Sequence, residues 1–140
     1  MNKNDKKYLG IDWGSAKIGL AVADEETKIS FGYGKIENDR NLLENLIKII
    51  TKEEIDAVVI GIPEHIVRQG EDFEGKLLGD EIEKKTKIQV YYQNEMFTTK
   101  MAEANLIERG TKKIKNFDDE ESARIILQEW MDCKSIESRA

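Results

Sequence analysis

Cysteine is almost absent from this sequence, since Cys133 is the only one among 140 residues. A lone cysteine excludes an intrachain disulfide and agrees with a reducing compartment. Long hydrophobic runs are missing as well, because the stretch from Ala57 to Ile62 is far shorter than the roughly 18 residues of a membrane-spanning helix. The lysines near the start precede a segment that contains Asp12, not the apolar region of a signal peptide. We therefore expect a cytoplasmic protein with no membrane segment.

Positive charge is in deficit, with 22 lysine and arginine residues against 28 acidic residues and a formal net charge of -6. This balance argues against a broad nucleic-acid-binding surface, because phosphate binding is usually driven by basic residues and counterion release. There is one local exception, since Lys112, Lys113 and Lys115 crowd a short segment beside Arg109. The sequence thus allows a basic edge on an otherwise acidic domain.

The composition suits a folded domain, because 39% of the residues are hydrophobic, 36% are charged and proline occurs once. A chain of this length can bury a core and is too short for two ordinary domains. We predict one domain that spans residues 1–140.

The first part of the chain predicts three antiparallel strands. Apolar runs cover Tyr8 to Asp12 and Ile18 to Ala23, with a turn between them that contains glycine. A third strand is expected over Lys28 to Ile36. Three of its side chains would alternate on one face: Ile29, Phe31 and Tyr33.

Helices and strands then alternate. A helical stripe covers Asn41 to Thr51 and is followed by a β-branched run over Ala57 to Ile62. A helix over about Phe73 to Lys85 precedes a strand over Ile88 to Tyr92. This alternation predicts parallel pairing, and the whole pattern predicts an α/β fold with a five-stranded mixed sheet flanked by helices.

Two more helices complete the predicted order βββαβαβαα. One begins at Thr98 or Thr99 and runs to about Arg109. The other is capped by Asp118 and extends through Trp130. The last six or so residues are expected to form a frayed tail.

Three carboxylates stand at positions where this fold would bring them together. Asp12 ends an apolar strand, where an ionised carboxylate is costly unless it is paired or bound to metal. Glu95 comes just after a strand, at the end where open α/β sheets place their ligand sites. Asp119 begins a helical stripe that is expected to face the sheet. The other members of this stripe are Ala123, Ile126, Leu127 and Trp130.

Each carboxylate also has a simpler explanation. Asp12 suits a turn in which it caps local amides, Glu95 suits a solvated loop, and Asp119 suits the positive end of a helix dipole. However, three carboxylates from two strand ends and a helix start are typical of a two-metal phosphoryl-transfer site, where hard oxygen ligands bind Mg²⁺ or Mn²⁺.

Four segments of the chain read as motifs. The segment from Gly10 to Asp24, GIDWGSAKIGLAVAD, looks like the opening motif of the YqgF/RuvX family. VVIGIP, which begins at Val58, resembles its second strand-loop motif. NEMFTT, which begins at Asn94, is similar to its Asp-Glu-Arg-Leu-Thr-Thr segment, and DEESARIILQ, which begins at Asp119, resembles its terminal motif. The resemblance covers nearly the whole chain.

This resemblance implies an RNase H-like fold and catalysis by Mg²⁺ or Mn²⁺ on a nucleic-acid phosphodiester. It also implies that Asp12, Glu95 and Asp119 are the catalytic metal ligands. Family members are described as nucleases of pre-16S rRNA in ribosome biogenesis and, by fold kinship, as Holliday junction resolvases. The expected partner is therefore structured RNA, pre-rRNA or branched DNA, bound by a monomer or a weak homodimer.

The sequence departs from the family pattern at several positions. Asn94 replaces an acid, Met96 replaces an arginine, and Lys17 keeps the charge of an arginine without its planar fork. His65 stands in a loop that reads differently from the family loop. A lone loop histidine is more often a surface residue than a general base, so we leave it outside the catalytic set.

Five residues are candidates for substrate binding: Lys17, Thr98, Lys112, Lys113 and Lys115. The lysine cluster could grip phosphates beside Asp119, although charged loops are often merely solvated. Trp13 could stack on a base, but packing in or near the core is the preferred interpretation.

Two other functions compete with the nuclease. An ATP-binding domain of the actin and sugar-kinase type also opens with an Asp-x-Gly hairpin, but that architecture needs a second such loop, which this chain lacks. A non-catalytic nucleic-acid-binding assembly factor would keep the fold, with Asn94 and Met96 marking lost chemistry. Retention of all three acidic residues favours the active nuclease.

Overall fold

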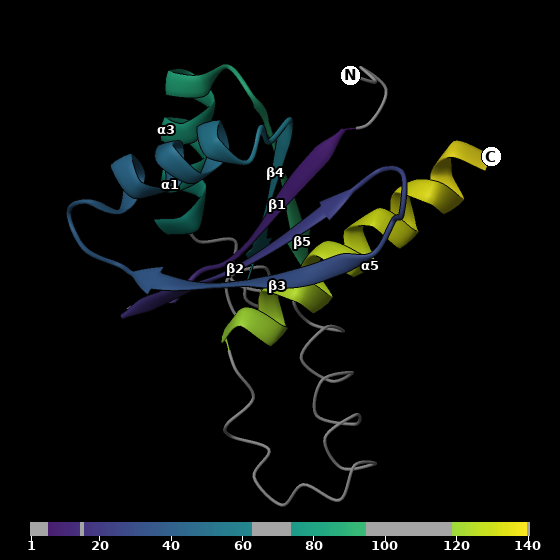
Figure 1. Ribbon diagram of the computed structural model, residues 1–140, viewed down its shortest axis with the longest axis horizontal. Helices are drawn as coiled ribbons and strands as arrows, with labels where there is room; N and C mark the ends of the chain where they lie inside the picture. The colour runs from purple at the N-terminus through teal and green to yellow at the C-terminus, as the bar shows by residue number, and fades with distance from the viewer. Residues whose placement is uncertain (1–5, 15, 63–73, 95–118, 140) are drawn as a thin grey trace, which may run out of the picture.

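A mixed five-stranded sheet forms the centre of the protein in the computed structural model (Figure 1). The structure describes residues 6–14, 16–62, 74–94 and 119–139. The strands lie in the spatial order β3-β2-β1-β4-β5, which confirms the predicted mixed sheet. Their bounds are β1 Lys7–Asp12, β2 Lys17–Asp24, β3 Ser30–Glu37, β4 Ala57–Ile62 and β5 Gln89–Asn94.

The strands pair as the order of elements predicts. The first three strands form an antiparallel meander, because short turns join them. Strands β4 and β5 each follow a helix and pair in parallel, β4 with β1 and β5 with β4. Consequently β1, β4 and β5 all point the same way, and their carboxyl ends share one edge of the sheet.

Helices cover both faces of the sheet (Figure 1). Helices α1 (Leu42–Lys52) and α3 (Glu74–Thr86) lie on one face, and α5 (Asp119–Arg139) lies across the other. The alternation of β1 explains this arrangement, since Leu9 and Ile11 enter the core beneath α1 and α3. Tyr8, which precedes Leu9, points the other way and faces the second core, which α5 closes with Ala123, Ile126 and Leu127. None of the helices that the structure describes combines the length and apolar character needed to cross a membrane.

Two predictions about where elements begin or end are wrong. Helix α5 continues to Arg139 and does not stop at Trp130, so the expected frayed tail is helical up to that residue. Its second half is held by tertiary contacts, because Met131 is buried and Lys134 packs on β1. The third strand begins at Ser30, so Ile29 precedes it and is not part of the predicted face. Phe31 and Tyr33 do share one face, because Phe31 pairs with Val22, and both Val22 and Tyr33 pack against the core beneath α1 and α3. The helix predicted over residues 98–109 lies outside the described residues.

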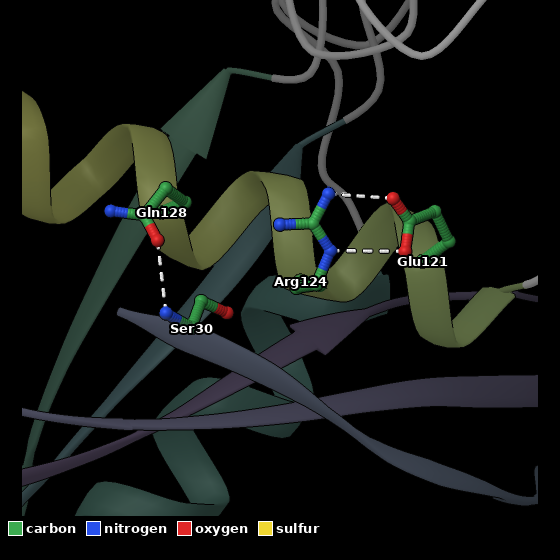
Figure 2. A network of polar contacts seen from close by, with 4 residues as sticks. All are labelled: Ser30, Glu121, Arg124 and Gln128. Atoms are coloured by element: carbon green, nitrogen blue, oxygen red, sulfur yellow. Dashed lines mark hydrogen bonds and ion pairs between the residues drawn. The ribbon is translucent and has the colours of Figure 1, made fainter. Parts of the chain in front are cut away.

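Gln128 joins α5 to the turn between β2 and β3 (Figure 2). Its side-chain oxygen accepts a hydrogen bond from the backbone N–H of Ser30 at 2.9 Å, and its amide nitrogen donates to the carbonyl of Lys28 at 2.9 Å. Lys28 itself has a φ of +57°, an uncommon conformation for a residue with a side chain. The amide side chain of Gln128 therefore pairs with the N–H of Ser30 and the carbonyl of Lys28 in this turn, and it aligns α5 along β3.

The edge of the sheet opposite the carboxyl ends of β1, β4 and β5 carries a compact polar cluster. The hydroxyl of Tyr8 donates to the Glu25 carboxylate at 2.5 Å and accepts from the Lys134 ammonium at 2.8 Å. The ring of Tyr8 meets that of Trp130 edge-on, with centroids 5.1 Å apart. Burial and the hydrogen bond to Glu25 raise the pKa of Tyr8. The same hydrogen bond, donated by the Tyr8 hydroxyl, lowers the pKa of Glu25.

We expect Tyr8→Phe to reduce the acid sensitivity of the fold. Because the pKa of Glu25 is lowered in the folded state, its stabilisation is present above its ordinary pKa of 4.5 and is lost as pH falls through the lower folded value. The variant lacks the main cause of this shift. It should be less stable than the wild type near pH 7 by at most about 1 kcal/mol, since the Glu25 side chain is 35% exposed. The difference in the free energy of unfolding between the two proteins should shrink below pH 4.5. Urea unfolding at pH 7 and pH 3.5 measures this difference, and an equal value at both pH values contradicts the account.

Candidate active site

Asp12 is the last residue of β1, at the edge where the carboxyl ends of the parallel strands meet. Its side chain is partly buried. The neighbouring parallel strands end close by, β4 at Ile62 and β5 at Asn94, and these two residues are register partners. A carboxylate at this edge is therefore placed where α/β sheets usually bind ligands.

Glycine flanks Asp12 on both neighbouring strands. Gly19 of β2 is its direct antiparallel partner. On the other side, Ile11 pairs with Ile60 in parallel, so the next residue of β4, Gly61, lies level with Asp12. Neither neighbour contributes a side chain beside the carboxylate. This pattern leaves Asp12 as the only side chain on the three central strands at that level.

The same level continues to the outer strands of the sheet. Lys35 of β3 pairs with Gly19, and Gln93 of β5 pairs with Gly61. Directly paired residues point to the same face of a sheet, and here that face is the one covered by α5. We call Lys35, Gly19, Asp12, Gly61 and Gln93 the Asp12 row. A lysine and an amide thus stand at its two ends.

Close packing of α5 on β1 brings the start of that helix to the Asp12 row. A Cβ atom at Gly10 would lie 2.8 Å from the Cβ of Leu127 and 3.1 Å from the carbonyl oxygen of Ala123. Trp130 lies further along the helix and contacts Tyr8, so α5 runs antiparallel to β1. Asp119 comes one helical turn, or about 5.4 Å, before Ala123, and Asp12 comes two strand residues, or about 6.6 Å, after Gly10. Because Ala123 contacts Gly10, the backbone of Asp119 lies at about the level of Asp12.

The turn that follows Asp12 is held in place by Asn38, the residue just after β3. The side-chain amide of Asn38 donates to the carbonyl of Gly14 at 2.6 Å, and the backbone N–H of Asn38 donates to the carbonyl of Ala16 at 2.9 Å. A Cβ at Gly14 would collide with the carbonyl of Lys17, so this tight turn needs glycine. Trp13 is partly buried against the core, which agrees with the preferred prediction for this residue.

The first turns of α5 carry a paired guanidinium and carboxylate (Figure 2). Arg124 donates from Nε and one terminal nitrogen to the two oxygens of Glu121, at 3.0 Å and 2.6 Å. These hydrogen bonds raise the pKa of Arg124. Glu120, on the same turn, places its carboxylate against Gly32 of β3. The first turn of α5 thus carries two acidic side chains, of which Glu121 is paired with Arg124 and Glu120 lies against β3.

A cavity of about 300 Å³ opens between β5 and the second half of α5, and it extends from Gln93 toward the opposite edge of the sheet. The rings of Tyr91 and Trp130 meet at its wall, with centroids 4.9 Å apart. Its lining combines aromatic, amide and cationic side chains: Tyr91, Tyr92, Gln93, Trp130, Cys133 and Lys134. The cavity is therefore suited to a planar polar group such as a nucleobase.

Comparison with protein families gives a match to one family model over residues 6–133, and the family is described as RuvX, Holliday junction resolvase. The chain belongs to the RuvX family. This membership confirms the resemblance drawn from the sequence motifs, and it agrees with the predicted enzyme class, a nuclease, rather than with an ATP-binding domain.

Relatives with curated names support the same class. This RuvX chain is 32% identical over 135 residues to a protein of Agathobacter rectalis, a match that covers 90% of the chain and 94% of the relative. It is 33% identical over 136 residues to a protein of Streptococcus equi subsp. zooepidemicus, covering 91% and 98%. Both relatives are named, provisionally, as pre-16S rRNA nucleases.

Solved structures establish the fold. RuvC of Thermus thermophilus, in a complex with a Holliday junction substrate, matches this RuvX chain with a TM-score of 0.59 at 16% identity, covering 93% of the chain and 96% of RuvC. A fowlpox virus resolvase, in a complex with Holliday junction DNA, matches with a TM-score of 0.55 at 13% identity, covering 94% and 97%. The predicted RNase H-like fold is thus confirmed.

The residues predicted for the site fall into two groups. The structure places Asp12 and the backbone of Asp119 at one edge of the sheet, and it places Lys17 on the surface as the first residue of β2. Among the residues that it describes, no three acidic, histidine or cysteine side chains gather as a metal site. The remaining predicted residues lie outside the described ranges: Glu95, Thr98, Lys112, Lys113 and Lys115. Met96 and His65 lie there as well.

Sequence reasoning missed the two ends of the Asp12 row. Lys35 and Gln93 stand in no motif that marks chemistry, and each joins the row only through strand register. Gly19 and Gly61 do belong to the family-like motifs, but their place beside Asp12 is likewise a property of the sheet. Alternation along β5 offered one signal, since Gln93 follows Tyr91 on the same face of the strand.

Proposed function

We propose that this chain is a divalent-metal-dependent nuclease that hydrolyses a phosphodiester bond of pre-16S rRNA in the cytoplasm during ribosome biogenesis. The observation that carries the proposal is Asp12 at the carboxyl edge of the sheet, between two glycines and level with the start of α5. Family membership supports the chemistry, and the names of the curated relatives support the RNA substrate.

The described donor at this edge, the carboxylate of Asp12, suits a hard divalent cation. Carboxylate oxygens are the ligands that Mg²⁺ and Mn²⁺ prefer, and Asp12 already lies at the strand end with no side chain beside it on β2 or β4. We propose that Asp12, Glu95 and Asp119 hold the metal. When bound, the metal would supply Lewis acidity toward the phosphoryl oxygens and the attacking water.

The described residues give this site its rigidity and access. Asn38 fixes the turn after Asp12, and the contact of Gly10 with Leu127 fixes the height of α5 over β1. A metal ligand must be held in place to be effective, so these contacts preorganise the carboxylate before substrate arrives. The glycines beside Asp12 leave room for a bulky sugar-phosphate to approach the carboxylate over the face of the central strands.

Substrate contacts are proposed on both sides of the Asp12 row. Lys17, at the start of β2, can attract phosphates electrostatically without the bidentate geometry of arginine. Thr98, Lys112, Lys113 and Lys115 remain candidates for further contacts with the nucleic acid. The cavity lined by Tyr91 and Trp130 offers a place for an unpaired base, which favours a substrate with single-stranded segments.

Cleavage of a Holliday junction is the second candidate function. The description of the family and the junction-bound RuvC and fowlpox resolvase structures favour it. Junction resolution requires two symmetric cuts and hence a homodimer, whereas trimming of an RNA end requires only a monomer. We propose the monomer for this chain, and light scattering at the concentration of the cleavage assay tests it.

The function is tested with two labelled substrates, a structured pre-16S rRNA fragment and a four-way DNA junction. We expect cleavage of the RNA with Mg²⁺ or Mn²⁺ and none after addition of a chelator, because the carboxylates alone supply no Lewis acid. Restoring the metal should restore the rate. Cleavage of the junction alone would support the second candidate, and RNA cleavage that persists in chelator would contradict metal-dependent catalysis.

A further inference from the structure

Lys35 lies at the β3 end of the Asp12 row, two strands away from the carboxylate. Gly19 pairs with both residues, so Lys35 and Asp12 share one level and one face of the sheet. Two strand spacings separate their Cα atoms by about 10 Å. Because the residue between them is glycine, no side chain of β2 separates the lysine from the carboxylate at that level.

An irregularity in β3 determines which face Lys35 occupies. Ala21 of β2 pairs with Gly32 of β3, but the adjacent residue, Leu20, pairs with Gly34. Tyr33 is therefore an extra residue in β3 at this point. Without this bulge, Lys35 would pair with Ile18, whose side chain faces the core beneath α1. The bulge therefore turns Lys35 to the Asp12 face and Ile36 to the core. Gly34, with a φ of +136°, permits the bulge.

The charge and the exposure of Lys35 suit the binding of a phosphate group. Its side chain is exposed, and ion pairs at exposed positions contribute little to stability. The Glu120 carboxylate lies against Gly32 on the same face, so Lys35 stands at the border of an acidic region. A strand of nucleic acid that reaches Asp12 through such a region needs a cation there to offset the repulsion of its phosphates.

We propose that Lys35 forms a phosphate-binding subsite that positions the nucleic-acid strand on which the Asp12 carboxylate acts. The long stem of lysine lets its ammonium reach over Gly19 toward a phosphate next to the cleaved bond. This inference rests on the proposed nuclease function, because the strand is the substrate of that site. It makes Lys35 a positioning residue and assigns it no step in the chemistry.

The test compares Lys35→Ala with Lys48→Ala in an Asp12→Asn background, which keeps the RNA intact. Lys48 is an exposed lysine of α1, on the opposite face of the sheet, so it is a matched control. Fluorescence anisotropy measures binding of a labelled pre-16S rRNA fragment between 50 and 200 mM salt, conditions over which phosphate contacts are strongly salt-dependent. We expect Lys35→Ala to weaken binding roughly tenfold at the lowest salt. The salt slope should fall by about 0.7 for a single strand or 0.9 for a duplex.

Further variants separate this role from a structural one. Lys35→Arg should keep the salt slope, because it keeps the charge, and thermal unfolding of Lys35→Ala should match that of the wild type. A slope that is unchanged in Lys35→Ala, or lowered equally by Lys48→Ala, overturns the subsite. Cleavage by the wild type and by Asp12→Asn, measured separately, tests the nuclease itself. If Asp12→Asn is inactive and Lys35→Ala binds normally, only the subsite fails; if Asp12→Asn still cleaves, the proposed function fails.

Discussion

Asp12→Asn is expected to lower the rate of metal-dependent cleavage by at least about 100-fold. Loss of a residue that only supports a metal ligand costs up to about 100-fold, and loss of a ligand itself should cost no less. Asparagine has the shape of aspartate but carries no charge, so it binds Mg²⁺ or Mn²⁺ poorly. The fold should survive, because Asp12 stands at a strand end where the backbone pairing with Gly19 does not depend on the side chain. Single-turnover cleavage of the labelled RNA, with saturating metal, measures the effect.

Asp56→Asn provides the control. Asp56 lies just before β4, at the opposite edge of the same sheet, where its carboxylate accepts a hydrogen bond from the backbone of Lys7 at 2.9 Å. Its replacement removes the same charge from the chain without touching the carboxyl edge. An equal loss of rate in both variants would point to a general charge effect, and an unchanged rate in Asp12→Asn would exclude Asp12 as a catalytic metal ligand.

Gly10→Ala is expected to destabilise the protein by about 1–3 kcal/mol, the usual cost of inserting atoms into a packed core. The new Cβ would lie 2.8 Å from the Cβ of Leu127 and 3.1 Å from the backbone of Ala123. Both are atoms of the helix that cannot move without moving α5. The helix start should therefore shift away from Asp12, and the cleavage rate should fall together with stability. Urea unfolding and the cleavage assay measure the two effects.

Gly32→Ala is the matched comparison. Its Cβ would meet the side chain of Glu120, which is flexible and can swing away, while the backbone of α5 stays in place. This variant should lose much less stability than Gly10→Ala. If the two substitutions cost the same, close approach of α5 to β1 is not what Gly10 provides; if Gly10→Ala loses stability at full activity, the start of α5 does not set the geometry of the site.

Local sequence patterns predicted most of the architecture because the signals for it are local. The apolar run in Tyr8 to Asp12 and the helical stripe in Asn41 to Thr51 report directly which side chains become buried. The prediction failed where burial depends on a distant partner. Helix α5 extends beyond Trp130 because Lys134 finds Tyr8 and Glu25 on the sheet, and no pattern in the tail itself indicates those contacts.

The sequence by itself determined the order of the described elements and the family, and it singled out Asp12 as a candidate, because hydrophobic periodicity and motif spacing lie along the chain. Only the tertiary structure decided what surrounds Asp12. Strand register aligns Gly19 and Gly61 beside it, and a single extra residue in β3 turns Lys35 toward it. The physical reason is the two-residue period of a strand: a shift of one residue reverses every side chain, and pairing between distant segments sets that shift.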